Sequence, residues 1–333
     1  MLEFDLGKAV AEAKKRKAGL VAVQVPEGLK ARLPAILEKI EKGTGAEAFA
    51  FIEPCFGACG VKDIASKELG ADLLIHFGHT KFVAKEAIDT VYIPVEYRVD
   101  EKNVSSLVES LAGKMKEKKL KKLALCSTIQ FKGHAKLVES GLKKKGFQAF
   151  LGKGKKLEKG QVLGCNYSSI KAVEKKADAI VFVGDGLFHP IGLSFSAKKP
   201  VFLANPVEGE VQELLTQHDL FLRKRIAMIE KARQAKSVGI WVSTKKGQQR
   251  LGLARKLKKK FEAKGKKAFV FTSNLLSPEY ILGVEVEAIV STACPRIALD
   301  DSSLYGKPIV NPEEALIALG EKKVEDYCFE ELE

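Results

Sequence analysis

The stretch EPCFGACGVKDIASKELGADLLIHFGH, residues 53–79, joins a cysteine-bearing turn, a helix and a buried strand. In this stretch Cys59 stands twelve residues before Ala71, which opens the strand-like run ADLLIHFGH. The same pattern returns where Cys165 stands twelve residues before Ala177 and the run ADAIVFVGD. Because both copies have the same residue types in the same order, they predict a repeated structural unit.

A weaker third copy contains Asn274, which stands twelve residues before Val286 and the run VEAIVSTAC. Asn274 takes the place of the first two cysteines, and Cys294 takes the place of His79 and Asp185. Each copy therefore places one cysteine in a loop near the end of a strand. We expect the rest of the chain to be the scaffold that brings these three loops together.

Strand-like and helix-like runs alternate along the whole chain, which is typical of βαβ units and a parallel sheet. The repeated unit is much longer than a solenoid repeat and indicates three related domains. We expect an α/β fold of three homologous domains, each a four-stranded parallel sheet flanked by helices, in a pseudo-threefold arrangement around a central site. A long helix, expected over residues 208–235, leads into the third domain. The expected domains are 1–116 with Cys59, 117–211 with Cys165, and 212–333 with Cys294.

The composition is that of a soluble globular protein, with 46% hydrophobic and 29% charged residues in a chain of 333. Its apolar runs are strand-sized and too short to cross a membrane, and its first residues lack the apolar core of a signal peptide. Six cysteines without a dense spacing pattern do not indicate a secreted disulfide scaffold. These features predict a cytoplasmic protein that is not associated with a membrane.

The net charge of +14 leaves two interpretations open. A basic protein can bind nucleic acid or an acidic partner, but lysine-rich surfaces also occur in proteins from hot environments. The lysines gather in the segments 114–122 and 256–267, with few aromatic residues among them. This distribution favours a solvated surface, and we expect no direct contact with nucleic acid.

Cys59, Cys165 and Cys294 lie in turns that contain glycine or proline, beside a strand end or a helix start. A helix N-terminus favours the thiolate form of cysteine, so a shared metal site is one interpretation of these residues. The other is that they are small buried hydrophobic residues, as free cysteines often are. Cys126 and Cys328 fit that second interpretation better.

Three thiolates from three domains suit an iron–sulfur cluster better than zinc. Structural zinc takes four ligands, usually from paired CxxC motifs. A four-iron cluster normally takes four cysteines, so three would leave one iron open for chemistry. Cys55 and Cys59 form a CxxxC pair, which makes a fourth thiolate conceivable, but we interpret Cys55 as a spare.

Polar and glycine-rich segments follow the predicted strands, where open α/β sheets bind their ligands. His79 and His189 are candidates for proton handling or substrate contact, or are histidines held by local hydrogen bonds. Asp185 and Arg296 lie in equivalent loops and suit a zwitterionic amino-acid group, because arginine binds carboxylates through two bonds. The chain has no P-loop, no HExxH and no Ser–His–Asp order, nor a dinucleotide GxGxxG in its first βα turn.

Seven motifs carry a resemblance to a known family. They are PEGL at 26–29, GAC ending at Cys59, HFGHT at 76–80, GCN around Cys165, VGDGLFHP at 183–190, STKKGQ at 243–248 and ACPRIALDD at 293–301. In this order, and over almost the whole chain, they resemble the archaeal diphthamide-synthesis enzymes. Each motif alone is weak, and the set is specific.

The resemblance implies a homodimeric 2-(3-amino-3-carboxypropyl)histidine synthase that performs the first step of diphthamide biosynthesis. It implies a [4Fe–4S] cluster held by Cys59, Cys165 and Cys294, with S-adenosylmethionine at the open iron. An electron donor would reduce the cluster, and radical cleavage at the Cγ–S bond would release a 3-amino-3-carboxypropyl group. That group would be transferred to the imidazole C2 of a histidine in elongation factor 2.

We expect no catalytic residue beyond the cluster. The expected lining of the S-adenosylmethionine pocket is Gly78, His79, Gly184, Asp185, Gln248 and Arg296. One alternative is quinolinate synthase, which has the same cluster arrangement and acts on small acids. The other is a basic, non-catalytic binding protein with structural cysteines. The order of the motifs favours diphthamide synthesis.

Overall fold

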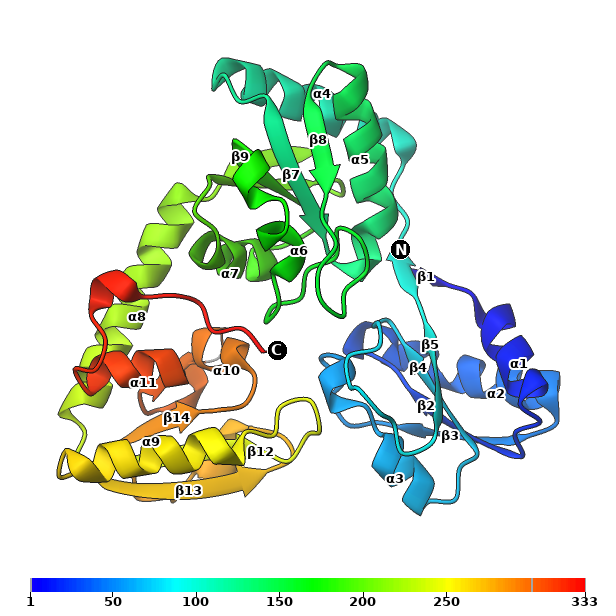
Figure 1. Cartoon of the computed structure of the whole chain (residues 1–333). Helices are drawn as coiled ribbons and strands as arrows, with labels where there is room; N and C mark the ends of the chain where they lie inside the picture. Colours follow the sequence, from blue (N-terminus) through cyan, green and yellow to red (C-terminus); the bar gives the residue numbers. More distant parts are fainter. Residues whose placement is uncertain (1, 301, 333) are drawn as a thin grey trace.

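The structure is a computed structural model that describes residues 2–300 and 302–332. Figure 1 shows three lobes at the corners of a triangle, each with its own sheet and helices. The lobes follow one another along the chain, and the C-terminal segment returns to the centre of the view. Within the described residues, no helix is both long and apolar enough to span a membrane.

The first lobe has a parallel sheet in the order β3-β2-β4-β5. Its central strands are apolar on both faces because helices cover the sheet. A two-stranded antiparallel ribbon, β1 with β6, lies where the first lobe meets the second. The elements are β1 (Leu2–Phe4), α1 (Leu6–Lys15), β2 (Leu20–Gln24), η1 (Glu27–Arg32), α2 (Leu33–Thr44), β3 (Glu47–Phe51), η2 (Ala58–Gly60), α3 (Asp63–Glu68), β4 (Leu73–Phe77), β5 (Asp89–Ile93) and β6 (Val95–Tyr97).

The second lobe has the order β11-β10-β9-β7-β8, in which only β11 is antiparallel to its neighbour. Its elements are α4 (Glu101–Glu117), β7 (Lys122–Ser127), η3 (Ile129–Phe131), α5 (Lys132–Lys144), β8 (Gln148–Leu151), α6 (Ser168–Lys171), η4 (Glu174–Lys176), β9 (Ala179–Val183), α7 (Phe188–Ser196), β10 (Val201–Asn205) and β11 (Glu210–Glu213).

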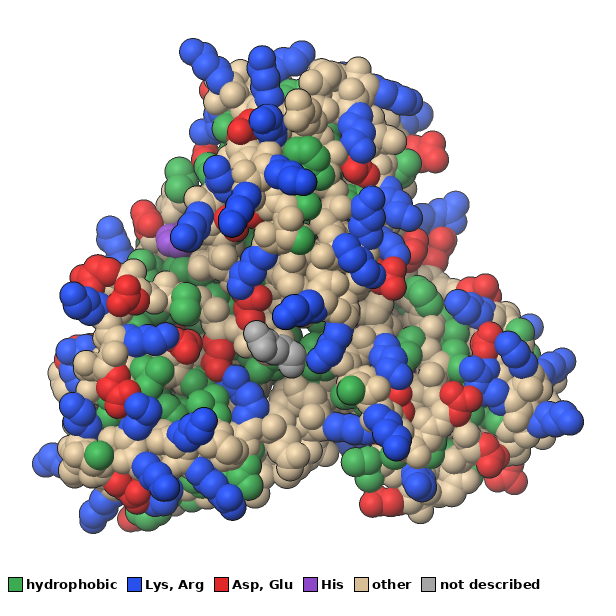
Figure 2. Space-filling model, in the orientation of Figure 1, with side chains coloured by type: hydrophobic (Ala, Val, Ile, Leu, Met, Phe, Trp, Pro, Cys, Tyr) green, Lys and Arg blue, Asp and Glu red, His purple; other side chains and the backbone are tan. Residues whose placement is uncertain are grey.

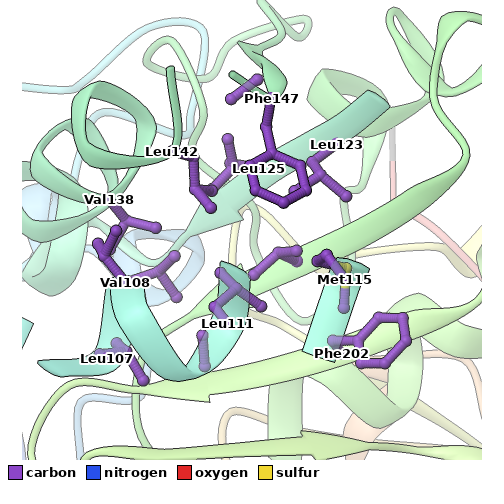
Figure 3. Close-up of a cluster of buried hydrophobic side chains, with 14 of the residues drawn as sticks. Leu107, Val108, Leu111, Met115, Leu123, Leu125, Val138, Leu142, Phe147 and Phe202 are labelled. Atoms are coloured by element: carbon purple, nitrogen blue, oxygen red, sulfur yellow. The ribbon is translucent and has the colours of Figure 1, made fainter. Parts of the chain in front are cut away.

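Helix α4 places its apolar side chains in the core of the second lobe. Leu107, Leu111 and Met115 recur at helical spacing and pack with Val138 and Leu142 of α5 over the sheet (Figure 3). The expected domain boundary at residue 116 assigns this helix to the first domain. Its packing favours a second domain that begins before α4.

The third lobe has a parallel sheet in the order β13-β12-β14-β15. Helix α8 is tied to this lobe by the buried ion pair between Arg225 and Glu314, with Nη2 and Oε2 2.7 Å apart. The elements are α8 (Leu215–Gln234), β12 (Ser237–Ser243), α9 (Leu251–Ala263), β13 (Lys267–Ser273), η5 (Pro278–Ile281), β14 (Ala288–Ser291), α10 (Pro295–Asp300), η6 (Ser302–Tyr305), β15 (Ile309–Val310), α11 (Pro312–Ala318) and η7 (Val324–Asp326).

One strand order therefore occurs three times, as β3-β2-β4-β5, β8-β7-β9-β10 and β13-β12-β14-β15. This confirms the α/β fold with several parallel sheets flanked by helices. The second sheet is larger than expected because β11 extends it. The pseudo-threefold arrangement stays a prediction.

The helix expected over residues 208–235 was predicted with the wrong start. Residues 210–213 instead form β11, which pairs antiparallel with β10, and the helix begins at Leu215. Asn205 Oδ1 accepts bonds from the backbone N–H groups of Val207 and Glu208, at 2.9 and 3.3 Å. Gly209 then takes a positive φ of 75°, which closes the hairpin.

Basic side chains are spread over the visible face of all three lobes, with acidic ones among them (Figure 2). Several lysines and arginines form ion pairs within one helix, such as Lys143 with Glu139 at 2.8 Å. Pairs of this kind contribute little stability. The visible distribution fits the solvated-surface interpretation of the net charge.

Candidate metal centre

The three cysteines of the repeat all lie beyond the carboxyl ends of strands. Cys59 is in the single turn η2 after β3, and Cys165 is in the loop between β8 and α6. Cys294 stands between β14 and α10. All three are partly buried, whereas Cys126 is buried within β7 and Cys328 is exposed. The parallel strands thus deliver one thiol from each lobe.

The Cys165 thiol interacts electrostatically with the thiols of Cys294 and Cys59. Burial raises the pKa of Cys165 well above its ordinary value, and the sulfurs of Cys294 and Cys59 raise it further. Like charges have this effect only at short range. A partly buried thiol whose ionisation is opposed by two other thiols fits a bound metal group, because a cation reverses that balance and coordinates thiolates.

The STKKGQ loop between β12 and α9 packs directly on the Cys59 turn. Gln248 Nε2 donates a hydrogen bond to Cys59 Sγ at 3.1 Å, and Gly247 N–H donates to Cys59 O at 3.0 Å. Lys246 Nζ pairs with the buried Asp63 carboxylate at 2.8 Å. A Cβ on Gly247 would lie 2.7 Å from Cys59 Cα, so this close approach requires glycine. The Gln248 bond lowers the pKa of Cys59, although burial, the largest effect, raises it.

Arg296 acts on Cys165 and lies where the third lobe meets the second. Its guanidinium carbon is 3.6 Å from the ring centre of Phe188 and 5.5 Å from that of Phe329. The residue is only 5% exposed, and its charge lowers the pKa of Cys165. Leu332 N–H donates to Cys165 O at 2.8 Å, so the C-terminal segment covers the same turn.

Three of the expected binding residues lie near the seam between the first and second lobes. Gly78 has a positive φ of 85°, and its carbonyl accepts a bond from Gln130 Nε2 at 2.8 Å. Gly184 is buried at the end of β9, and the neighbouring Asp185 is exposed. Burial and the hydrogen-bonded Asp185 carboxylate raise the pKa of Tyr97. The candidate residues therefore fall into two groups, one at this seam and one beside the cysteines.

The two candidate histidines have different surroundings. His79 Nδ1 lies 2.9 Å from Nε2 of the fully buried His76, a residue that the sequence interpretation missed. The HFGH spacing carried that signal, because it places both rings at the end of one strand. His189 stacks on Phe182 at 5.8 Å, and burial and Arg296 lower its pKa to about 3. His189 is therefore a neutral ring packed among aromatic groups at ordinary pH.

The C-terminal contacts were also missed, and no sequence pattern indicated them. Glu331 Oε2 accepts a bond from Tyr167 N–H at 3.2 Å, and Phe329 packs in the core of the second lobe. These contacts complete the surroundings of Cys165.

Known proteins match this chain over nearly its whole length. The model of the family described as putative diphthamide synthesis protein matches residues 25–328. The 2-(3-amino-3-carboxypropyl)histidine synthase of Pyrococcus horikoshii is 34% identical over 99% of this chain and 94% of that protein. The enzyme of the same name from Methanocaldococcus jannaschii is 33% identical over 94% of this chain and 87% of that protein.

A solved structure matches as well. The crystal structure of Dph2 from Pyrococcus horikoshii with a 4Fe-4S cluster has a TM-score of 0.91 and 34% sequence identity. The match covers 100% of this chain and 95% of that one. The fold described here is therefore also the fold of a protein that contains such a cluster.

Proposed function

Because the chain belongs to the diphthamide synthesis family, we propose that it transfers the 3-amino-3-carboxypropyl group of S-adenosylmethionine to a histidine of elongation factor 2. The acceptor atom is C2 of the imidazole, and the reaction is the first step of diphthamide biosynthesis. The observation that carries the proposal is the electrostatic effect of Cys59 and Cys294 on Cys165, because the three partly buried cysteines come from three lobes. The family match favours this activity over quinolinate synthase and over a non-catalytic binding protein.

We propose that Cys59, Cys165 and Cys294 hold a [4Fe–4S] cluster. Their thiols are partly buried and, with one from each lobe, they leave one iron without a protein ligand. When bound, a reduced cluster supplies the electron that breaks the Cγ–S bond of S-adenosylmethionine. The three domains proposed for the chain would each contribute one ligand, with α4 placed in the second domain.

The chain's own residues would bind and orient S-adenosylmethionine. The Arg296 guanidinium, fixed against Phe188, would hold the carboxylate, and the exposed Asp185 would hold the amino group. Gly78, His79, Gly184 and Gln248 would complete the lining. Orientation decides which sulfonium bond faces the open iron, and therefore which bond breaks. The proposed setting is a cytoplasmic homodimer that receives electrons from a separate donor.

An anaerobic assay with elongation factor 2, dithionite and labelled S-adenosylmethionine tests the proposal. The expected result is label on one histidine of the elongation factor, together with methylthioadenosine. If 5′-deoxyadenosine is the main product, the proposed bond cleavage is wrong. A reduced, cluster-loaded protein that labels no histidine contradicts the proposed substrate.

The Arg296→Ala variant tests the proposed binding role separately. It should keep its iron and lose the transfer, because the carboxylate of S-adenosylmethionine is no longer held. Unchanged transfer would remove Arg296 from the site.

A further inference from the structure

A second group of metal-ligating side chains lies in the first lobe. Ligand atoms of Cys55, His76 and His79 all lie within 4.8 Å of one another. Cys55 is 4% exposed and His76 is 0% exposed. None of the three belongs to the set of Cys59, Cys165 and Cys294, and the proposed transfer gives no role to Cys55 or His76.

A chain of hydrogen bonds fixes the tautomer of His76. Lys62 N–H donates to Gln24 Oε1 at 3.1 Å, and Gln24 Nε2 donates to Gly60 O at 3.0 Å. The Gln24 oxygen is therefore the atom 2.9 Å from His76 Nδ1, and Nδ1 must donate to it. This leaves a lone pair on His76 Nε2, which accepts from Nδ1 of His79 at 2.9 Å.

Both rings are in the neutral form that binds metals. Burial lowers the pKa of His79 to about 4 and lowers that of His76 well below its ordinary value. Burial also raises the pKa of Cys55 to about 11. The Cys55 thiol donates to Gly57 O at a weak 4.0 Å. A buried thiol with so weak a partner gains more from a cation than from its present contact.

The spacing of the three residues fits a tetrahedral ion. Ligand atoms around Zn²⁺ are roughly 3.3–3.6 Å apart when the bonds have ordinary lengths. His76 Nε2 and His79 Nδ1 are 2.9 Å apart and need to move only slightly further apart to admit the ion. A set of one thiolate and two imidazoles binds Zn²⁺ in preference to harder cations.

We propose that Cys55, His76 and His79 form a Zn²⁺ site that is separate from the three cysteines of the proposed cluster. Binding releases the Cys55 thiol proton to solvent, and the His79 proton moves from Nδ1 to Nε2. Gln24 holds the His76 ring in place through Nδ1, as partners outside the ligand set commonly do. Three protein ligands leave the fourth position to water, as in sites where zinc remains reactive.

The site would also stiffen the turn that presents Cys59. Cys55 and Cys59 belong to the same short turn, and Gly60 O is held by Gln24. An ion that ties Cys55 to the end of β4 therefore fixes both flanks of Cys59.

The test measures zinc in the full chain after incubation with Zn²⁺ and dialysis. Zinc also binds empty cluster sites, so the main comparison uses a variant with Cys59, Cys165 and Cys294 all changed to alanine. We expect about one zinc per chain in that background and in the cluster-loaded wild type. The zinc K-edge absorption spectrum should show one sulfur and two nitrogen neighbours.

Ligand variants decide the outcome. Cys55→Ser and His79→Ala should each lose the zinc, while Cys126→Ser, at another buried cysteine, should keep it. Gln24→Ala should weaken the affinity about 10–100-fold without loss of the site. A wild type that retains no zinc overturns the proposal, as does full zinc retention in Cys55→Ser. Far-ultraviolet circular dichroism shows whether each variant is folded. If His79→Ala does not fold, the nearly isosteric Cys55→Ser still tests the site.

Discussion

At the scale of single residues, the six cysteines fall into distinct environments. Cys59, Cys165 and Cys294 are partly buried in loops, Cys55 is buried in a loop, Cys126 is buried in a strand, and Cys328 is exposed. The repeat register in the sequence separates these groups, because it depends only on position relative to a strand. It does not indicate what surrounds each thiol, which depends on contacts between lobes.

The first prediction concerns iron content. Cys59→Ala, Cys165→Ala and Cys294→Ala should each lose the intact cluster, because each removes one of three ligands. Iron and sulfide per chain are the measurement, made after anaerobic purification. Full cluster content in any of the three variants would contradict the ligand assignment.

Three other cysteine variants are the controls. Cys126→Ala, Cys328→Ala and Cys55→Ala should keep their cluster, since none of these residues is among the proposed ligands. Loss of the cluster in Cys55→Ala alone would mean that Cys55, and not Cys59, is the ligand from the first lobe.

The second prediction concerns the hydrogen bond from Gln248 to Cys59. Gln248→Ala should keep the cluster and lower its reduction potential, because an N–H donor to sulfur stabilises the more negative, reduced state. One hydrogen bond worth about 1 kcal/mol corresponds to roughly 40 mV for one electron. The measurement is a redox titration followed by electron paramagnetic resonance.

Gln130→Ala is the matched control for Gln248. Gln130 also donates across a lobe boundary, but its acceptor is Gly78 O and not a cysteine. The reduction potential of the cluster in Gln130→Ala should equal that of the wild type. An equal shift in Gln130→Ala and Gln248→Ala would rule out the specific N–H···S effect.

At the scale of elements, the STKKGQ loop is held by close backbone contact. The third prediction is that Gly247→Ala displaces this loop, since its Cβ would lie 2.7–2.9 Å from the Cα, Cβ and O atoms of Cys59. Such overpacking costs about 1–3 kcal/mol. Both the free energy of unfolding, measured in denaturant, and the iron content should fall.

For Gly252→Ala in the neighbouring helix α9 we expect no loss of stability. A Cβ at Gly252 meets nothing within 4 Å, and alanine favours a helix over glycine by up to about 1 kcal/mol. The variant should be as stable as the wild type or slightly more so. Equal destabilisation of both variants would show that the contact with Cys59 is not the cause.

The elements themselves were largely predictable from periodicity. Strands such as β4 and β9 are buried on both faces, so they appear as continuous apolar runs that need no tertiary information. The hairpin at β11 was missed because its four residues, Glu210 to Glu213, are mostly polar or charged and adjoin a true helix. What makes them a strand is pairing with β10, which is a tertiary contact.

At the scale of the whole molecule, the site depends on how the lobes meet. The sequence predicted three loops with one cysteine each, but it did not predict that Gln248 would reach Cys59 or that Arg296 would stack on Phe188. Such pairs are far apart in the chain and have no fixed spacing. The C-terminal segment is the strongest example, because it joins the second and third lobes around Cys165.

Glu330 makes this junction sensitive to pH. Its Oε1 pairs with Arg250 Nη2 at 2.5 Å, but its Oε2 is buried without a hydrogen-bond partner in the described part of the chain. Desolvation therefore outweighs the attraction of Arg250 and raises the pKa of Glu330 to about 7 from an ordinary 4.5. Between these two values the folded state binds a proton that the unfolded state has lost. The free energy of unfolding must then fall as the pH rises through this range.

The last prediction is that Glu330→Gln removes this dependence. The variant keeps an oxygen for Arg250 and carries no charge, so at pH 8 it should be more stable than the wild type, by roughly 3 kcal/mol at most. Near pH 5 the two proteins should differ little, because Glu330 is then mostly protonated in the folded state. Denaturant unfolding at both pH values measures the difference, and Glu325→Gln, an exposed acidic residue in the same segment, should change stability by less than about 0.5 kcal/mol at either pH. A Glu330→Gln variant that is less stable than the wild type at pH 8 would mean that the ion pair with Arg250 outweighs the burial of the carboxylate.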